Sequence, residues 1–172
     1  LQHGRRHRPA RDRARRRGPA TARPCAAGGG SPGSPTITEE VLDALPKLLE
    51  EYQIVHQTGR LNYEDVVGRS RVAVQDSATL ERYKPFDYLN DLATRMAAGS
   101  ASLVVSRAGA GNIFETAAWG LPAILVPIPE PISHDQTKNA FAYARAGGAS
   151  VLEQNNLTPG LLISEIHRIL GD

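Results

Sequence analysis

The stretch LVVSRAGAGNIFETAAWGL, residues 103–121, decides the fold that the sequence predicts. A short apolar run, Leu103–Val105, ends at Ser106 and predicts a strand. The small residues within Arg107–Gly111 predict a turn, and from Asn112 onward apolar residues recur at helical spacing. A strand, a glycine turn and a helix in this order bring unpaired backbone N–H groups and the positive end of a helix dipole to one place. Such a place suits a phosphate or a sugar diphosphate.

Glu115 falls on the first turn of this predicted helix, where its carboxylate can face the glycine turn. A carboxylate repels phosphate, so its natural target is a pair of hydroxyls such as those of a ribose. The same pattern is also typical of an ordinary strand-to-helix turn in which glycine allows tight packing. From this stretch alone, both interpretations stay open.

Length and composition predict one domain with an aliphatic α/β core. The chain has 172 residues, of which 41% are hydrophobic and 5% aromatic. Its longest apolar runs, such as Pro122–Ile128, are much shorter than a segment that crosses a bilayer. The single cysteine, Cys25, excludes a disulfide within the chain and favours a reducing compartment.

Positive charge is concentrated at the N-terminus. Residues 1–24 contain nine Arg and one Asp, whereas the remaining residues contain 11 Lys or Arg and 17 Asp or Glu. Residues 1–27 lack helical or strand periodicity, and we predict an Arg-rich disordered or aberrant tail. A basic arm for nucleic acid or anionic lipid and a mitochondrial presequence are alternatives. A solvated tail or an out-of-frame translation is favoured, and no secretory signal is expected because no apolar h-region follows.

A second glycine loop, Gly28–Ser34, also precedes a predicted helix. Thr36 can cap that helix with Glu39 as its capping-box partner, and apolar residues then recur at helical spacing. Pro46 lies inside the pattern, where a kink is expected. A flexible linker is the alternative for the glycine-rich segment, but the capped helix that follows at once weakens it.

His56 lies in a predicted strand, Tyr52–Thr58. The side chain could be catalytic or a ligand, but no metal-ligand spacing surrounds it, and a histidine satisfied within the fold is favoured. The next predicted elements are a helix over 61–68, a strand over 72–74, a strand or loop end over 82–86, and a helix over 88–98 with Leu89, Leu92, Ala93 and Met96 on one face.

After the opening stretch, the all-apolar run Ala123–Val126 is typical of a strand inside a parallel sheet. A helix over Asp135–Ala146, a strand over Ala149–Leu152 and a helix capped by Thr158 follow. The alternation predicts a Rossmann-like α/β fold, a parallel sheet with helices on both faces. Ligands of such sheets bind beyond the carboxyl ends of the strands. Four polar features share that edge: the two glycine loops, Pro85–Asp87 and His134–Gln136.

Seven motifs stand in this order: GGSPGS (29–34), VHQTG (55–59), PFDYL (85–89), VVSRAGAGNIFE (104–115), GLPAILVPIP (120–129), HDQTKNA (134–140) and LTP (157–159). Over residues 28–172 their order and spacing resemble the C-terminal, donor-binding domain of the MurG family. That family consists of GT-B glycosyltransferases, in which two Rossmann-like domains face a cleft. The family transfers N-acetylglucosamine from UDP-N-acetylglucosamine to the lipid-linked muramoyl-pentapeptide of peptidoglycan synthesis.

The resemblance implies a role in donor binding for each matching position. Ser31 would contact the diphosphate, and the backbone of Asp87 would hold the edge of the uracil. Glu115 would bind the ribose hydroxyls, while Asp135 and Gln136 would reach hydroxyls of the N-acetylglucosamine. The residues that would wrap the donor beside Glu115 are Ala110, Gly111, Asn112, Ile113 and Phe114, with Arg107 and Asn139 as neighbours.

The implied reaction is an inverting hexosyl transfer. The C4 hydroxyl of the muramoyl sugar would attack C1 of the donor sugar, and the glycine loop and helix end would meet the growing charge of UDP. No metal or cofactor is expected, and nucleic acid is not expected as a partner. The catalytic base stays unassigned, because the resemblance places it on the family's N-terminal domain. The same domain would bind the undecaprenyl-linked acceptor and the cytoplasmic face of the bacterial membrane, peripherally.

Three departures from the family pattern lead to further expectations. The N-terminal domain is missing from this sequence, so we expect a fragment that binds the donor but is inactive alone. Thr21–Ala26 replaces an apolar strand and should fill a central strand poorly, which suggests a truncated or frame-shifted product. Pro32 removes one N–H donor from the first glycine loop. The alternatives are the donor-binding subunit of a split two-chain transferase and a related lipid glycosyltransferase.

Overall fold

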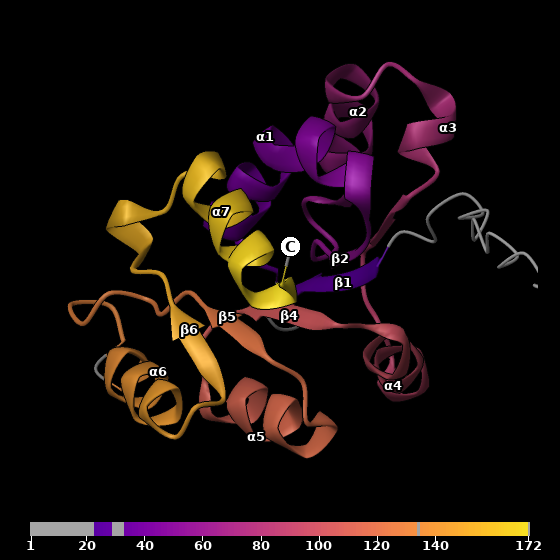
Figure 1. The fold of residues 1–172 in the computed structure, drawn as a ribbon. Coiled ribbons are helices and arrows are strands. Elements are labelled where there is room, and N and C mark those ends of the chain that lie inside the picture. The colour runs from indigo at the N-terminus through magenta and orange to yellow at the C-terminus, as the bar shows by residue number, and fades with distance from the viewer. Residues whose placement is uncertain (1–22, 29–32, 134, 172) are drawn as a thin grey trace, which may run out of the picture.

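Six strands form a single parallel sheet in the order β3-β2-β1-β4-β5-β6 (Figure 1). The computed structural model describes residues 23–28, 33–133 and 135–171, and of residues 23–28 it describes the backbone. The strands are β1 (Arg23–Gly28), β2 (Tyr52–Gln57), β3 (Tyr83–Phe86), β4 (Leu103–Ser106), β5 (Ala123–Leu125) and β6 (Ala149–Val151).

Helices cover both faces of this sheet, which confirms the predicted Rossmann-like α/β fold. Helices α1, α2 and α7 lie over one face, and α4, α5 and α6 lie over the other (Figure 1). The helices are α1 (Pro35–Glu51), α2 (Tyr63–Ala73), α3 (Ser77–Leu80), α4 (Asp91–Ser100), α5 (Ala110–Trp119), α6 (Gln136–Arg145) and α7 (Pro159–Leu170), with a 3₁₀ turn η1 (Gln154–Asn156).

Strand β1 corrects the expectation that the segment before the first glycine loop cannot fill a central strand. It pairs with β2 on one side and with β4 on the other. Pro24 lies opposite Gln53 of β2, but the pairing with β4 begins only at Cys25. The residue without an N–H therefore stands at the start of the strand, where a proline is tolerated. The Arg-rich residues 1–22 lie outside the described residues, so the predicted tail stays a prediction.

The N-cap of helix α1 lies two residues earlier than predicted. Ser34, not Thr36, is the N-cap, and its Oγ accepts a hydrogen bond from the Ile37 N–H at 3.4 Å. Pro35 follows at the first helical position, where its missing N–H costs nothing. The helix then continues through Pro46 to Glu51. At the other end of the chain, the cap predicted for α7 is confirmed, because Thr158 Oγ1 accepts from the Leu161 N–H.

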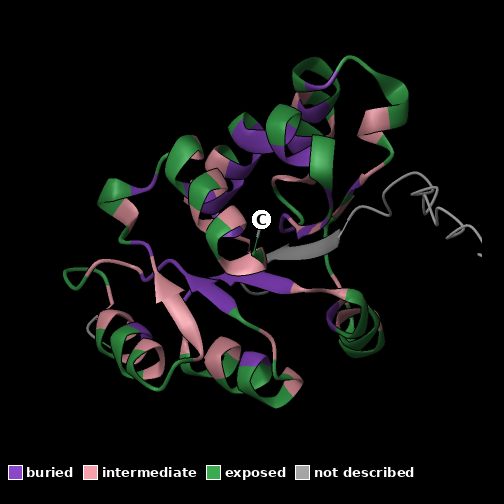
Figure 2. Cartoon of the chain, in the orientation of Figure 1, coloured by how far each residue is buried: buried purple, intermediate pink, exposed green. Residues whose placement is uncertain are grey.

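The larger apolar core lies between the sheet and helices α1 and α7, as the buried inner side of α1 shows (Figure 2). The opposite face has a smaller core of small side chains, among them Ala108, Ala123 and Ala140. On that face α4 is loosely covered, since Leu92 and Met96 are each 68% exposed. The apolar face predicted for this helix is therefore not turned into the core.

The strand predicted over residues 72–74 is also wrong, because α2 extends through Ala73.

Among the described residues, no helix is both long enough and apolar enough to cross a membrane.

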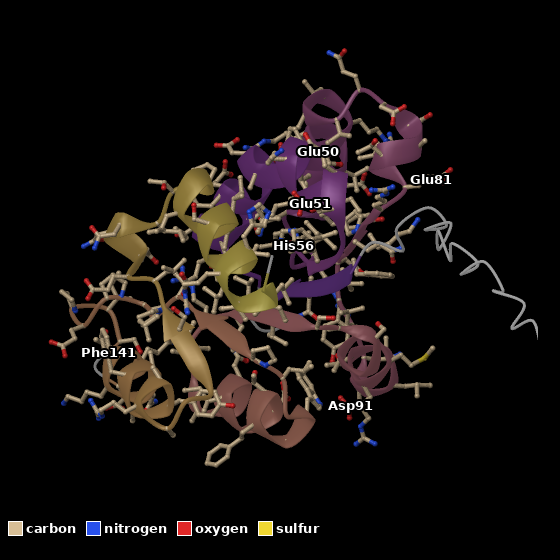
Figure 3. The ribbon with its side chains drawn as sticks, viewed as in Figure 1. Glu50, Glu51, His56, Glu81, Asp91 and Phe141 are labelled. Carbon is tan, nitrogen blue, oxygen red and sulfur yellow. The ribbon has the colours of Figure 1, made fainter. Side chains whose placement is uncertain are left out.

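His56 is satisfied inside the fold, as the sequence predicts. It lies on the α1 side of the sheet (Figure 3), with Nδ1 2.7 Å from the Tyr83 hydroxyl and Nε2 3.3 Å from Thr38 Oγ1. Burial lowers the pKa of the imidazole to about 4, because the charged form loses its hydration. The same desolvation raises the pKa of Tyr83 above its ordinary value.

We predict that His56 makes the protein less stable in mild acid. In the unfolded chain this histidine is protonated below about pH 6.5, whereas in the folded protein its imidazole stays neutral down to about pH 4. Stability from this group is therefore complete above pH 6.5 and falls by about 3 kcal/mol on acidification to pH 4. Denaturant titration at several pH values measures the slope. In His56→Gln, which can keep hydrogen bonds but does not titrate, the slope should flatten, and an unchanged slope would contradict the assignment.

Candidate functional site

The candidate site lies at the carboxyl edge of the sheet, at its topological switch point. From β1 the chain proceeds to β2 and β3 on one side, and from β4 it proceeds to β5 and β6 on the other. The loops after β1 and β4 therefore diverge from neighbouring strands. A crevice between such diverging loops is the usual ligand site of an open α/β sheet.

Arg107, the first residue after β4, is buried at this edge with 8% of its surface exposed. Its Nε donates to Ser34 Oγ at 2.9 Å, and its Nη1 donates to the carbonyls of Val126 and Pro127 at 3.1 and 3.5 Å. Desolvation lowers the pKa of the guanidinium below its usual range. Among the described residues, no carboxylate forms an ion pair with it.

The turn after Arg107 leads directly into α5, which begins at Ala110 rather than at Asn112. Gly109 is the N-cap and offers no side chain to the helix, so the first amides remain available to a ligand. The Asn112 Nδ2 donates to the Arg107 carbonyl at 3.1 Å and so fixes the turn to the helix. Ala110, Gly111, Phe114 and Glu115 are exposed, and Ile113 packs partly against the smaller core.

The turn between β3 and α4 is held by side chains of which the sequence singled out only Asp87. Gln57 Oε1, at the end of β2, accepts from the Leu89 N–H at 2.9 Å. Asp87 Oδ1 accepts from the Tyr88 N–H at 2.7 Å. The Arg60 guanidinium carbon lies 5.7 Å from the centre of the Tyr88 ring. No local pattern marks Gln57 as an anchor, because its partner lies 32 residues away.

A cavity of about 610 Å³ opens between α4 and α5, with β4 beneath it. It brings together two predicted residues, Asn112 and Glu115, with Gln57, Tyr88 and Leu89 of the neighbouring turns. Asp91, the first residue of α4, also lines the cavity and is labelled in Figure 3. The cavity therefore joins the start of α5 to the β3–α4 turn, although the two are far apart in sequence.

The start of α6 lies beside the β4–α5 turn. Gln136 Oε1 accepts from the Ile128 N–H at 3.1 Å, and its Nε2 is 4.0 Å from where a Cβ on Gly109 would stand. Asp135 occupies the N-cap position, but its exposed carboxylate makes no cap bond. Asn139 follows one turn later and is half-buried. Asp135 and Gln136, which were predicted to reach the sugar, and their predicted neighbour Asn139 all lie outside the lining of the cavity.

The first glycine loop is described only from Gly33 onward, so predicted Ser31 lies outside the described residues. Gly33 has φ +77°, and a Cβ on it would stand 2.1 Å from the Thr58 carbonyl oxygen. Only glycine permits this approach of the loop to the β2–α2 turn. In the described part of the chain, no three His, Cys, Asp or Glu residues are grouped so that they could hold a metal ion.

Together the fold and the loops at its carboxyl edge define one Rossmann-like half of a GT-B glycosyltransferase. The profile of the glycosyltransferase family 28 C-terminal domain matches residues 27–172, and the chain belongs to this family.

Two curated relatives bear the name UDP-N-acetylglucosamine--N-acetylmuramyl-(pentapeptide) pyrophosphoryl-undecaprenol N-acetylglucosamine transferase. The one from Syntrophotalea carbinolica is 40% identical over 83% of this chain, and the one from Limosilactobacillus fermentum is 35% identical over 84%. This chain spans 38% of the length of each relative. The crystal structure of MurG from Acinetobacter baumannii superposes with a TM-score of 0.72 and 27% identity, over 87% of this chain and 42% of that one.

Gly33→Ala should destabilise the protein by at least about 1–2 kcal/mol, because the left-handed backbone disfavours a side chain and the new Cβ meets the Thr58 carbonyl. Denaturant titration measures the change. Gly68→Ala is the matched control, since Gly68 lies inside α2 with no atom within 4 Å of its Cβ position. This control should gain about 0.5–1 kcal/mol. Equal effects at both positions would contradict the close approach.

Proposed function

We propose that this chain binds UDP-N-acetylglucosamine as the donor half of an inverting glycosyltransferase. The whole enzyme would transfer N-acetylglucosamine to a lipid-linked muramoyl-pentapeptide, the acceptor named in the relatives that it matches. The observation that carries this proposal is the edge at which α5 and the β3–α4 turn line one cavity, with the start of α6 beside the β4–α5 turn.

The phosphate-binding part of the proposal rests on the starts of two helices. The amides at the start of α5 carry no side-chain cap, and the helix dipole adds positive potential there. Helix α1 begins after the first glycine loop, which follows β1, the neighbour of β4 at the switch point. A diphosphate between these two helix starts would receive backbone N–H groups from α5 and the Thr36 N–H from α1, because Pro35 has no N–H and the Ile37 N–H is bonded to Ser34 Oγ. As UDP leaves, these same groups would stabilise its developing charge.

The nucleoside would occupy the cavity. Glu115 lines it and forms none of the ion pairs of the described residues, so its carboxylate is available to accept hydrogen bonds from ribose hydroxyls. The Gln57–Leu89 hydrogen bond fixes the β3–α4 turn, whose backbone at Asp87 would meet the uracil edge. The N-acetylglucosamine would extend toward Asp135 and the free Nε2 side of Gln136, beside the β4–α5 turn.

In the proposed reaction the acceptor C4 hydroxyl attacks C1 of the donor sugar. A new C–O bond forms, the bond from C1 to the diphosphate oxygen breaks, and the hydroxyl proton passes to a general base. This chain spans 38% of its relatives, and we assign neither the base nor the acceptor site to its residues. We place the enzyme in peptidoglycan synthesis for cell shape and division, as a peripheral protein on the cytoplasmic face of the bacterial membrane.

Glu115→Ala should abolish discrimination between UDP and 2′-deoxy-UDP. The wild-type chain should bind UDP about 10-fold more tightly than its deoxy analogue, because a carboxylate loses a charge-assisted hydrogen bond when the hydroxyl is removed. Isothermal titration calorimetry with both nucleotides measures the ratio. Glu81→Ala, an exposed position on the other side of the molecule from α5 (Figure 3), should keep it. A folded wild-type chain that binds neither nucleotide would refute the proposed function.

Asp135→Ala should weaken the binding of UDP-N-acetylglucosamine more than the binding of UDP. The carboxylate is exposed and makes no cap bond, so its loss should spare α6 while removing an acceptor for a sugar hydroxyl. We expect the preference for the sugar nucleotide to fall by about 3- to 10-fold. The affinities of both ligands are compared for Asp135→Ala and for Lys138→Ala, an exposed control on the same helix. If both variants keep the wild-type ratio, Asp135 does not bind the sugar.

A further inference from the structure

Arg107 connects three segments that lie far apart in the sequence. Its Nε reaches Ser34 Oγ, 73 residues earlier in the chain, and its Nη1 reaches the carbonyls that follow β5. Its own carbonyl accepts from Asn112 Nδ2 in the first turn of α5. One residue therefore fastens the start of α1, the β4–α5 turn and the end of β5 to one another.

The partner of its Nε is also the cap of a helix. Ser34 Oγ accepts from the Ile37 N–H while it accepts from Arg107, so the position of the guanidinium and the start of α1 are coupled through one oxygen. Ser34 is itself buried. Since β1 and β4 are neighbours at the switch point, this link joins the residue that follows β4 to the start of the helix that follows β1.

The chemistry of the contacts indicates a geometric role. Every described acceptor of Arg107 is a neutral oxygen, either a hydroxyl or a backbone carbonyl. A guanidinium presents donors in a planar fork that can serve two acceptors on different segments, whereas an ammonium is a single point on a flexible chain. Lysine could supply the charge at this position but could not make both contacts with the same geometry.

We propose that Arg107 is a positioning residue, which holds the start of α1 at a fixed place relative to the β4–α5 turn so that the donor's diphosphate meets the starts of α1 and α5 together. This inference rests on the proposed donor binding and deepens it. It differs from a direct ligand role, because the guanidinium acts through Ser34 and the β5 carbonyls.

The test compares the affinities of UDP and uridine for the full chain and its variants by calorimetry. Arg107→Lys keeps a positive charge but loses the fork, and Ser34→Ala removes the shared acceptor. Both should lower the preference for UDP over uridine, by about tenfold for Arg107→Lys, while the affinity for uridine itself stays unchanged. A general loss of protein stability would lower the affinities for UDP and for uridine alike. Arg71→Lys, an exposed position on α2, is the matched control.

The inference is overturned if Arg107→Lys keeps the wild-type preference while Arg107→Ala loses it, because charge alone would then suffice. Amide hydrogen exchange without ligand provides a second measurement. In Arg107→Lys the Ile37 amide should exchange about tenfold faster, with no change in the central strand β4. If the wild-type chain binds neither ligand, the donor proposal fails and this exchange decides the positioning role, since an unchanged rate at Ile37 refutes it.

Discussion

The two strands of each described pair are parallel, and this constraint determines where the candidate site lies. Neighbouring parallel strands cannot be joined by a tight turn, so the chain crosses the sheet between one strand and the next, mostly through a helix. The loops that follow the strands consequently gather at one edge. Because the strand order reverses direction between β1 and β4, the chain leaves these two neighbouring strands toward opposite halves of the sheet, and this is where ligands of open α/β sheets bind. Strand β1 is thus essential to the site, although its sequence is an unusual one for a central strand.

The two faces of the sheet divide stability from ligand binding. On the α1 and α7 face, large aliphatic side chains pack closely, and the buried pair His56–Tyr83 is fully enclosed. On the other face, three of the four residues of the buried cluster are alanines, and the cavity lies between α4 and α5 over β4. A closely packed core cannot also hold an open cavity. The protein therefore relies on one face for its stability and keeps the other open.

The sequence predicted the fold class because periodicity and turn residues act locally. The β4–turn–α5 unit and the Thr158 cap follow from neighbouring residues and are found where predicted, except that α5 begins two residues earlier, which places Glu115 in its second turn rather than its first. Where it failed, a competing rule applied. Pro35 favours the first helical position, which moves the cap to Ser34, and a short apolar run at 72–74 continues α2 instead of forming a strand. The Gln57 anchor and the Arg107 contacts join residues 32 and 73 positions apart, so no local pattern could reveal them.

The charges at the edge restrict what kind of anion the site can accept. Glu115 in the second turn of α5 and Asp135 at the N-cap of α6 are exposed carboxylates, and both would repel a simple anion such as free phosphate. The same carboxylates become favourable partners when the ligand presents hydroxyls to them and directs its negative charge to the helix amides. A nucleoside diphosphate joined to a sugar has this distribution, with a ribose diol on one side of the diphosphate and sugar hydroxyls on the other. Under the proposed function, the arrangement would select against bare phosphate by repulsion as well as for the sugar nucleotide by attraction.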